Sequence, residues 1–385
     1  MMGSMMRRGS FGDGATLDLA FTTMNSTADL TAAGFTFTRS SSATYINASG
    51  LLVVAGSNVA RFDYDPTNVG TPRGLLIEGS ATNLICHSET FASSGGSNNW
   101  TTSGATLGSL IYEDPKGTFT APLLLATASN GTLLNNAGLS SAQRTFSIWL
   151  KRVNGTGNVQ LTLDNSTWTT VTITPNWARY QITATSTGHV GIRLQTSGDG
   201  VHIFGAQLET GSGASSYIPT GTSTANRASD KCISNSISSW YTQGIGTVVV
   251  SGRPLLTTPR TFWNFSAGAA VPRIQLYSSV GSDVNAYLEN PSGTGANIVF
   301  PTGSLTNGTL FKAAWAFQTG SHAACVNGNA VATSSTSSPA VPTSGMTRFS
   351  VGHRYDEVNQ FNGHIVSIKY WPSRLANADL QAFTT

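Results

Sequence analysis

The chain has few charged residues, few cysteines and no long apolar run. Of its 385 residues 10% are charged, the formal net charge is +3, and no basic run exceeds Arg7-Arg8. Nucleic-acid binding needs a larger basic surface, so the sequence predicts no nucleic-acid partner. A membrane-spanning helix needs at least about 18 consecutive apolar residues. Because no window approaches that length, we expect neither a signal peptide nor membrane insertion.

Cysteine and histidine lack the spacings of metal sites. The three cysteines, Cys86, Cys232 and Cys325, are odd in number and far apart, and no C-x-x-C pair occurs. The six histidines show no His-x-His or His-Glu-x-x-His spacing. These patterns predict neither a disulfide framework nor a zinc site. We expect no cofactor, and a structural calcium ion stays an open alternative.

The motifs of hydrolases and nucleotide enzymes are absent as well. Concanavalin-like glucanases place a nucleophile and a proton donor on one face of a strand, at every second residue. No Glu-x-Asp-x-Glu run occurs in the C-terminal strands, and the chain has no Gly-x-Ser-x-Gly elbow or phosphate-binding loop. The sequence therefore predicts a protein without enzymatic activity.

Asp63 and Asp65 form an Asp-x-Asp pair that could hold a divalent cation. We prefer another interpretation, in which one carboxylate caps the Pro66 turn and the other pairs with Arg61 or Arg73.

Glycine, serine, threonine and asparagine are abundant, which favours short strands joined by tight turns. Alternating apolar and polar residues recur at short spacing with Gly/Asn turns between them. This pattern predicts an all-β chain with two antiparallel β-sandwiches of the jelly-roll type. Only residues 376–383 predict a helix, with Asn377 as its N-cap.

The changes in pattern divide the chain into four parts. We predict an N-terminal attachment region over residues 1–84, in which residues 1–16 form a flexible arm. A jelly roll follows over 85–218, then a linker over 219–230 and a second sandwich over 231–385. The N-terminal strands are too few for a sheet of their own, so we expect them to pair with the next domain or with another copy of the chain.

Residues 73–84 form an apolar run between a proline and a serine-rich loop. Leucine and isoleucine side chains in this run would be left in water on a surface loop, so it predicts a buried strand and turn at a domain junction. Arg73 and Glu78 are candidate partners in a salt bridge there.

Aromatic side chains beside polar loops are the remaining candidates for binding, because sugars place their apolar faces on exposed rings. We predict carbohydrate binding at Trp100, Trp168, Tyr355 and Asn359. The alternative, a structural role in packing, is the interpretation that we favour for these residues. Five further tryptophans lie inside alternating strands, and we expect them to pack in the core: Trp149, Trp177, Trp263, Trp315 and Trp371.

Several motifs in combination resemble bacteriophage tail-fibre-like and virion-attached proteins, and the similarity covers most of the chain. In the N-terminal part it is carried by residues 35–45, 61–66, 73–78, 82–84 and 88–89. Residues 177–180, 205–211 and 216–220 look like the closing strands of a carbohydrate-binding-module jelly roll. Residues 362–365, 370–375 and 379–381 are similar to the end of phage concanavalin A-like (laminin-G-like) domains.

The resemblance implies a non-enzymatic protein on the exterior of a phage particle, and we expect a homotrimeric tail fibre or spike. Its N-terminal region would bind other virion proteins, and its sandwiches would bind host surface polysaccharide. One alternative is a head fibre or capsid decoration protein with a mainly structural role. Another is a polysaccharide depolymerase. The family motifs themselves assign no binding residue.

Overall fold

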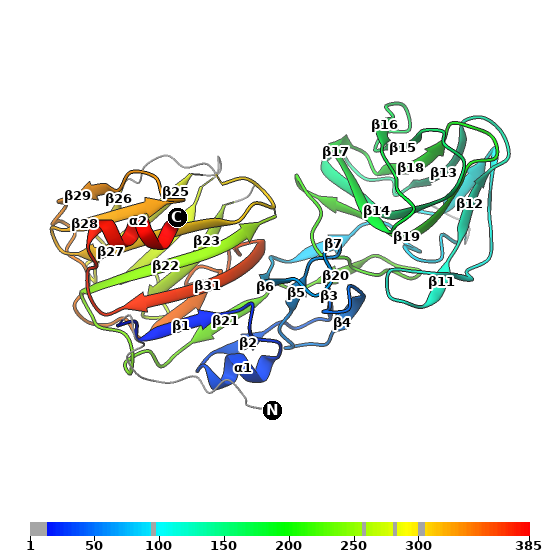
Figure 1. The fold of residues 1–385 in the computed structure, drawn as a ribbon. Helices are drawn as coiled ribbons and strands as arrows, with labels where there is room; N and C mark the ends of the chain where they lie inside the picture. Colours follow the sequence, from blue (N-terminus) through cyan, green and yellow to red (C-terminus); the bar gives the residue numbers. More distant parts are fainter. Residues whose placement is uncertain (1–13, 94–97, 256–258, 280–282, 299–304) are drawn as a thin grey trace.

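The computed structural model describes residues 14–93, 98–255, 259–279, 283–298 and 305–385. Two antiparallel β-sandwiches are joined by a narrower region of N-terminal strands (Figure 1). The predicted all-β fold with two sandwiches is confirmed. Within the described ranges no helix is long and apolar enough to cross a membrane. Nearly all of the predicted flexible arm, residues 1–16, lies outside the described residues.

The first sandwich, the jelly roll, is built from one continuous stretch of chain. Its strands are β8 (Trp100–Ser103), β9 (Ala105–Leu107), β12 (Leu123–Ala126), β13 (Gly131–Asn136), β14 (Ala142–Asn154), β15 (Val159–Thr162), β16 (Thr169–Val171), β17 (Ala178–Ser186), β18 (His189–Leu194) and β19 (Gly200–Thr210). One sheet has the order β17-β14-β19-β12-β9 and the other β16-β15-β18-β13-β8. Apolar side chains on alternate positions, such as Leu133, Ile148 and Ile192, fill the space between the sheets.

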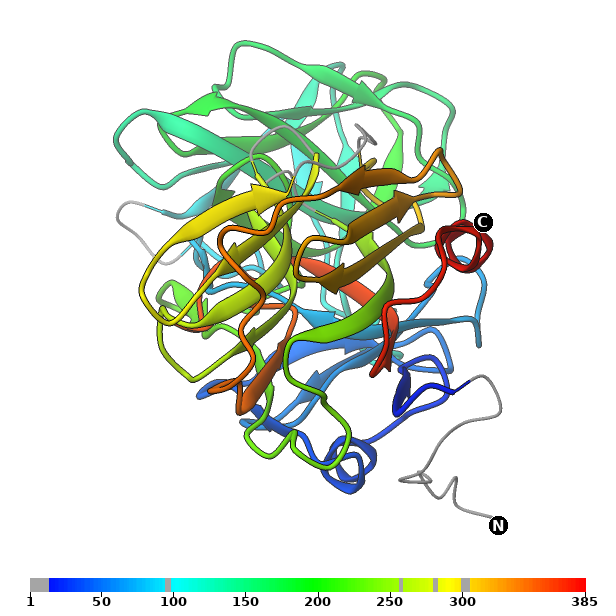
Figure 2. The same cartoon turned by 90° about the vertical axis from the view of Figure 1, so that its left-hand side faces the viewer.

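The second sandwich, the terminal sandwich, holds the strands near the C-terminus and faces the viewer in Figure 2. These strands are β21 (Lys231–Ser234), β22 (Ile245–Pro254), β23 (Arg260–Ser266), β24 (Arg273–Ser278), β25 (Val284–Glu289), β26 (Gly295–Ile298), β27 (Phe311–Gln318), β28 (His322–Val326), β29 (Ala332–Ser334), β30 (Arg348–Val351) and β31 (Gly363–Trp371). Trp263 and Trp315 stack across its core with ring centroids 5.7 Å apart. The predicted core positions of these two tryptophans are confirmed.

The N-terminal strands complete the terminal sandwich, which differs from the predicted separate attachment region. They are β1 (Leu17–Ala20), β2 (Thr36–Thr38), β5 (Phe62–Tyr64) and β6 (Pro72–Ile77). β6 and β1 pair in succession with the same edge of β31, and β5 extends the sheet beyond β6. β2 pairs with β21 in the opposite sheet. A hairpin of β3 (Ala43–Ile46) and β4 (Leu52–Ala55) projects toward the jelly roll (Figure 1).

The two crossings between the sandwiches lie side by side. β7 (Ala81–Asn83) on the outward crossing pairs with β20 (Ala225–Arg227) on the return. The return crossing falls within the predicted linker, residues 219–230, yet it contains a paired strand that ends at the buried Arg227 and is followed by the buried Asp230. Its small polar residues suit a tight ribbon as well as a loose linker, which is why composition alone pointed to a linker.

Residues 73–84 form the buried strand and turn that the sequence predicts. Leu75, Leu76 and Ile77 are at most 2% exposed in β6. Gly74 has φ +109°, and a Cβ at this position would lie 2.3 Å from the Ile365 carbonyl oxygen of β31. Only glycine allows this close pairing of β6 with β31.

Two helices occur in the described ranges. The predicted helix is confirmed as α2 (Asn377–Thr384), although Ala376, not Asn377, is its N-cap. The other helix, α1 (Thr27–Ala32), was not predicted, because six residues are too few for a helical period. A capping box holds its start: Ser26 Oγ accepts from the Asp29 N–H, and the Asp29 carboxylate accepts from the Ser26 N–H.

Candidate functional site

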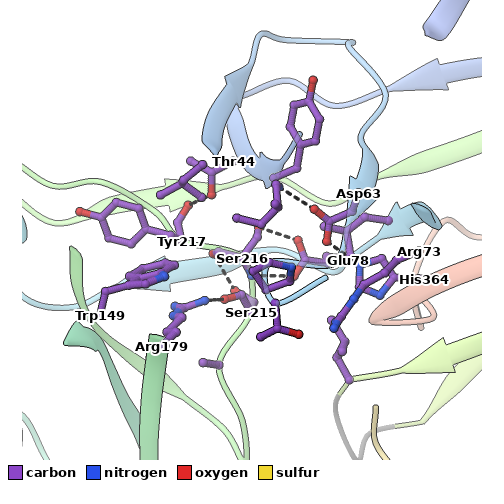
Figure 3. Close-up of a pocket in the computed structure, with 18 of the residues that line it drawn as sticks. Thr44, Asp63, Arg73, Glu78, Trp149, Arg179, Ser215, Ser216, Tyr217 and His364 are labelled. Carbon is purple, nitrogen blue, oxygen red and sulfur yellow. Dashed lines mark hydrogen bonds and ion pairs between the residues drawn. The ribbon is translucent and has the colours of Figure 1, made fainter. Parts of the chain in front are cut away.

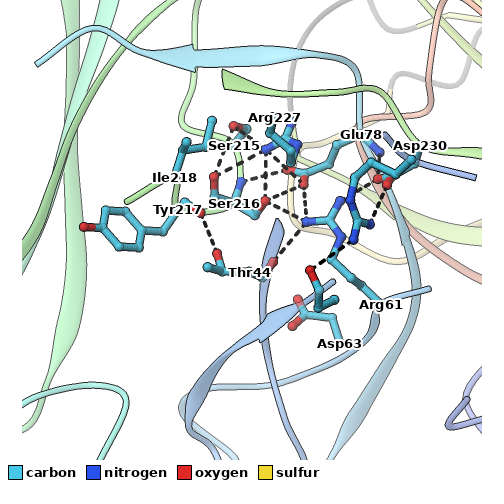
Figure 4. A network of polar contacts seen from close by, with 12 residues as sticks. Thr44, Arg61, Asp63, Glu78, Ser215, Ser216, Tyr217, Ile218, Arg227 and Asp230 are labelled. Carbon is cyan, nitrogen blue, oxygen red and sulfur yellow. Dashed lines mark hydrogen bonds and ion pairs between the residues drawn. The ribbon is translucent and has the colours of Figure 1, made fainter. Parts of the chain in front are cut away.

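A buried group of five charged side chains sits where the chain crosses between the sandwiches. These residues, called the junction cluster below, are Arg39, Arg61, Glu78, Arg227 and Asp230, and Figure 4 labels the last four. Each is at most 1% exposed. They meet because Glu78 directly follows β6 while Arg227 ends β20, the strand that pairs with β7 a few residues further on.

Asp230 and Glu78 hold the cluster together. The Asp230 carboxylate lies 3.0 Å from Arg39 Nη1 and 2.5 Å from Arg61 Nη2, and it accepts the Glu78 backbone N–H at 2.9 Å. Glu78 Oε2 lies 2.7 Å from Arg61 Nη1 and 3.3 Å from Arg227 Nη1. Three guanidinium groups against two carboxylates leave one formal positive charge in the cluster.

Glu78 and Arg61 stay ionised in the cluster although both are buried. Burial alone would raise the pKa of Glu78, but Arg227 and Arg61, together with the N–H and hydroxyl of Ser216, hold that pKa well below its usual range. Burial likewise lowers the pKa of Arg61, and the charges of Asp230 and Glu78 outweigh it and raise the pKa. Ser216 belongs to the segment that follows the last jelly-roll strand, so the cluster ties both sandwiches together.

A cleft of about 310 Å³, called the junction cleft, opens beside the cluster (Figure 3). Its walls come from three parts of the chain. The β3–β4 hairpin, β5 and β6 supply one side, β14, β17 and residues 214–217 supply another, and Leu255 and His364 supply the third.

Two tryptophans form the aromatic side of the junction cleft. Trp149 of β14 packs edge-on against Tyr217 with ring centroids 5.3 Å apart, and it is 8% exposed. Trp177, just before β17, is half-buried and donates its Nε1–H to the Glu113 carbonyl at 3.1 Å. Both tryptophans were predicted to pack in the core, and both also line the cleft.

Arg179 supplies the polar side of the cleft next to these rings. Its guanidinium carbon lies 4.5 Å from the centre of the Trp149 ring, and its nitrogens donate to Ser215 O at 2.7 Å and Ser147 Oγ at 2.9 Å. No carboxylate in the described chain lies within 4.0 Å of it. Burial lowers the pKa of Arg179, although the nearby charge of Glu209 opposes that effect.

Asp63 and His364 form a polar pair on the opposite wall. His364 Nε2 and Asp63 Oδ2 are 2.6 Å apart, and Asp63 Oδ1 accepts the Ile46 N–H at 2.6 Å. Asp63 thereby links the β3–β4 hairpin to β31. Its carboxylate oxygens are both engaged within the protein.

Asp65 takes both roles that the preferred interpretation had divided between two carboxylates. Its Oδ1 accepts from the Thr67 and Asn68 backbone N–H groups, which caps the Pro66 turn, and its Oδ2 lies 2.9 Å from Arg73 Nη2. The predicted salt bridge between Arg73 and Glu78 is therefore wrong. Among the described residues no group of three or more His, Cys, Asp or Glu side chains could hold a metal ion.

None of the predicted carbohydrate-binding residues lines the junction cleft. Trp100 is 2% exposed, packs edge-on against Phe91 and donates Nε1–H to Cys86 O, so its ring belongs to the jelly-roll core. Trp168 is half-buried, with the Arg193 guanidinium carbon 4.3 Å from its ring centre.

The other two predicted residues lie in the loop between β30 and β31. Tyr355 is half-buried, with the guanidinium carbon of Arg273 4.9 Å from its ring centre. Asn359 has φ +55°, and its carbonyl accepts the Thr261 N–H. Sugar binding at Trp168, Tyr355 and Asn359 stays a prediction.

The chain matches no known protein-family profile and no curated protein. Several solved structures are similar to part of it. The CBM40 of the Ruminococcus gnavus IT-sialidase, bound to alpha2,3 sialyllactose, is 17% identical with a TM-score of 0.33, over 37% of this chain and 84% of that one. Domain 4 of a GH43 extracellular arabinanase from Geobacillus stearothermophilus, in complex with arabinotriose, is 16% identical with a TM-score of 0.36, over 45% and 82%. A heptameric SAP-like pentraxin from Limulus polyphemus is 13% identical with a TM-score of 0.29, over 37% and 70%.

Proposed function

We propose that this chain is a glycan-binding protein without catalytic activity and that its junction cleft holds the sugar. The observation that carries the proposal is the placement of Trp149 and Trp177 beside the guanidinium group of Arg179 in one cleft of about 310 Å³, with Arg73 on another wall of the same cleft. Aromatic faces pack on the apolar face of a sugar ring, and guanidinium N–H groups donate to its hydroxyls. Small-ligand sites measure about 300–1,000 Å³, so the cleft has a suitable size.

The bonding of the cleft carboxylates supports the non-catalytic part of the proposal. Glycoside hydrolysis uses one protonated carboxylic acid and a second carboxylate that acts on the sugar or on water. Asp63 is bonded to Ile46 and His364, and Glu78 is held in the junction cluster. Neither carboxylate has an oxygen to spare for a substrate.

The finer proposal is a phage tail fibre or spike on the exterior of the virion, and the sequence resemblance supports it. Arg61 and Glu78 of the resembling motifs belong to the junction cluster, which gives those motifs a structural task. The N-terminal strands find their partners within the chain, so the proposed homotrimer and the contacts with other virion proteins rest on the resemblance. Light scattering at micromolar concentration tests the trimer, and a monomer would remove it.

Glycan binding is tested with the full chain on an array of bacterial surface polysaccharides, followed by titration of the retained glycan. Trp177→Ala should weaken binding about tenfold, because a stacked aromatic contributes about 0.5–1.5 kcal/mol beyond its area burial. Trp168→Ala tests the competing site predicted from the sequence, and it should leave the affinity within twofold if the junction cleft holds the glycan. Retention of no glycan, or a loss caused by Trp168→Ala alone, would refute binding in the junction cleft. A reducing-end assay on the same polysaccharides tests the depolymerase alternative, and we expect no product.

A head fibre or capsid decoration protein with a mainly structural role is the second candidate. The junction cluster favours it, because its buried ion pairs fix one sandwich against the other. Antibody labelling of virions distinguishes the two: label on the tail supports the fibre, and label over the capsid supports the decoration protein.

A further inference from the structure

The strand β17 ends one sheet of the jelly roll, and its outer edge carries no neighbouring strand (Figure 1). It pairs with β14 over all nine of its residues, without a bulge. Among the described residues no backbone group outside β14 is hydrogen-bonded to it. Every second residue of an antiparallel edge strand directs its N–H and C=O away from the neighbour, so β17 presents a row of backbone donors and acceptors to solvent.

The length and composition of β17 set it apart from the other sheet edges. Every other strand that ends a sheet in the described chain has at most four residues. Short edge strands, bulges, proline and charged side chains keep a sheet from pairing with another chain. β17 contains no proline, glycine, lysine or acidic residue, and its one charged residue, Arg179, directs its guanidinium to the Trp149 ring and the Ser215 carbonyl. The edge therefore lacks the usual protection against pairing.

Apolar side chains are incompletely covered at the same edge. β8 and β9 end the two sheets of the jelly roll on one side, so β16 and β17 end them on the other. At this open side Val171, Ile173, Tyr180 and Ile182 pack against the core but stay only half-buried. A strand added to β17 would cover Tyr180 and Ile182 and continue the apolar layer between the sheets.

We propose that β17 pairs with β17 of a second copy of this chain, antiparallel about a two-fold axis. In a register centred on Ile182 all nine residues pair, over a length of about 30 Å. Ile182 then lies opposite Ile182 of the second copy, which is a favourable β-branched pair. Gln181 lies opposite Thr183, and Arg179 lies opposite Thr185, so no like charges meet across the contact.

A second copy fits this edge better than an unrelated strand. The occupant must supply about nine regular residues, apolar side chains toward the core and no charge that opposes Arg179. β17 itself meets each condition, and a contact between identical surfaces closes after two copies. The pairing does not depend on what the junction cleft binds. It predicts an even number of chains, either a dimer or, if the proposed trimer also forms, a hexamer.

Light scattering of the full chain over a dilution series tests the pairing. The mass should be two or six times the chain mass of 40.2 kDa. Thr183→Lys combined with Thr185→Lys, both exposed on β17, should raise the dissociation constant of the pair about tenfold, because each lysine adds positive charge beside the same charge on the second copy. Thr101→Lys combined with Ser103→Lys, exposed on the short edge strand β8, is the matched control and should keep the parent mass. Circular dichroism checks that both variants are folded.

Cross-linking locates the contact. The native cysteines are buried, so Thr183→Cys introduces an exposed thiol for a short bismaleimide. The two thiols would be diagonal neighbours about 7–8 Å apart, and a linked pair of chains should form. Thr101→Cys on β8 is the control and should stay unlinked. A parent mass of one or three chains, an unchanged mass in the β17 lysine variant, or no link in Thr183→Cys overturns the proposal. A monomer whose β17 takes a strand from another protein overturns it as well.

Discussion

The two sandwiches are assembled from the chain in different ways. The jelly roll takes its ten strands from one uninterrupted segment, β8 to β19. The terminal sandwich needs both ends of the chain, because β1 and β6 pair with β31, and β2 pairs with β21. The jelly roll is therefore an insertion within the terminal sandwich, entered and left through the paired strands β7 and β20.

This difference indicates that the N-terminal region stabilises the terminal sandwich. Its core contribution to the terminal sandwich includes Leu17, Leu19, Phe21, Phe35, Phe37, Phe62, Leu75 and Ile77. Each such side chain contributes about 1.5–3 kcal/mol on burial, and domains are stable by only about 5–15 kcal/mol in all. A region that looks like an appendage in the sequence is thus indispensable to the fold.

The largest expected effect comes from cutting the chain near the predicted domain boundaries. Residues 231–385 alone should fail to fold, because they lack four strands and expose the core those strands cover. Residues 84–220 alone should fold as the jelly roll. Circular dichroism and the dispersion of amide proton signals measure both outcomes.

A chain without the jelly roll is the control. Asn83 and Ala225 are paired neighbours, so residues 14–83 joined to 225–385 by a short Gly/Ser turn should fold. Cooperative unfolding of residues 231–385 on their own would contradict the insertion.

The sequence predicts the strands better than their partners. Alternation identifies residues 364–371 as a strand. Its partner β1, however, pairs Leu17 with Tyr370, and these residues lie near opposite ends of the chain. No local sequence pattern predicts that pairing. Composition likewise made a paired crossing look like a linker.

The candidate site was harder to predict than the fold. The junction cluster draws single residues from separate segments, and a lone arginine beside a strand has no periodic signal. Trp149 and Trp177 were placed in strands, and only the tertiary structure shows that one side of each borders a cleft. The contacts of Asp65 could be predicted more closely, because the turn that it caps and its partner Arg73 are near it in sequence.

The joint between the sandwiches should be the next most sensitive place. Asp230→Asn should destabilise the chain by about 3–5 kcal/mol, because Arg39 and Arg61 would lose a buried counter-charge. Urea unfolding measures the loss. Asp65→Asn breaks a partly exposed pair with Arg73 and should cost at most about 1 kcal/mol. Similar losses of unfolding free energy in the two variants would show that the buried ion pairs contribute no more to stability than the partly exposed pair.

Acid should weaken the terminal sandwich through His353. Burial lowers the pKa of His353 to about 4, and its Nε2 accepts the Cys232 N–H at 3.2 Å. Protonation of Nε2 would replace this acceptor with an N–H donor that faces the Cys232 N–H, and the hydrogen bond would be lost. An unfolded histidine has its pKa near 6.5, so the unfolded state binds the extra proton between about pH 6.5 and 4. Stability from this residue is therefore full above about pH 6.5 and falls by on the order of 3 kcal/mol toward pH 4.

The control for this effect is His353→Gln, which keeps an acceptor but does not titrate. Its unfolding free energy should vary less with pH between 6.5 and 4 than that of the parent. An equal slope in the two proteins would exclude His353 as the source.

The variant with the smallest expected loss of stability tests whether the two sandwiches unfold as one unit. Ser26→Ala removes the cap of α1, whose Leu30 is buried in the core of the terminal sandwich, and should cost about 1 kcal/mol. Ser49→Ala, in an exposed turn, is the control and should cost nothing measurable. In calorimetry the Ser26 variant should lower the melting transition of the terminal sandwich and leave that of the jelly roll in place, because a continuous insertion keeps its own core. An equal shift of both transitions would mean that the two sandwiches unfold as one unit. The junction cluster would then couple them, and the jelly roll would not unfold independently.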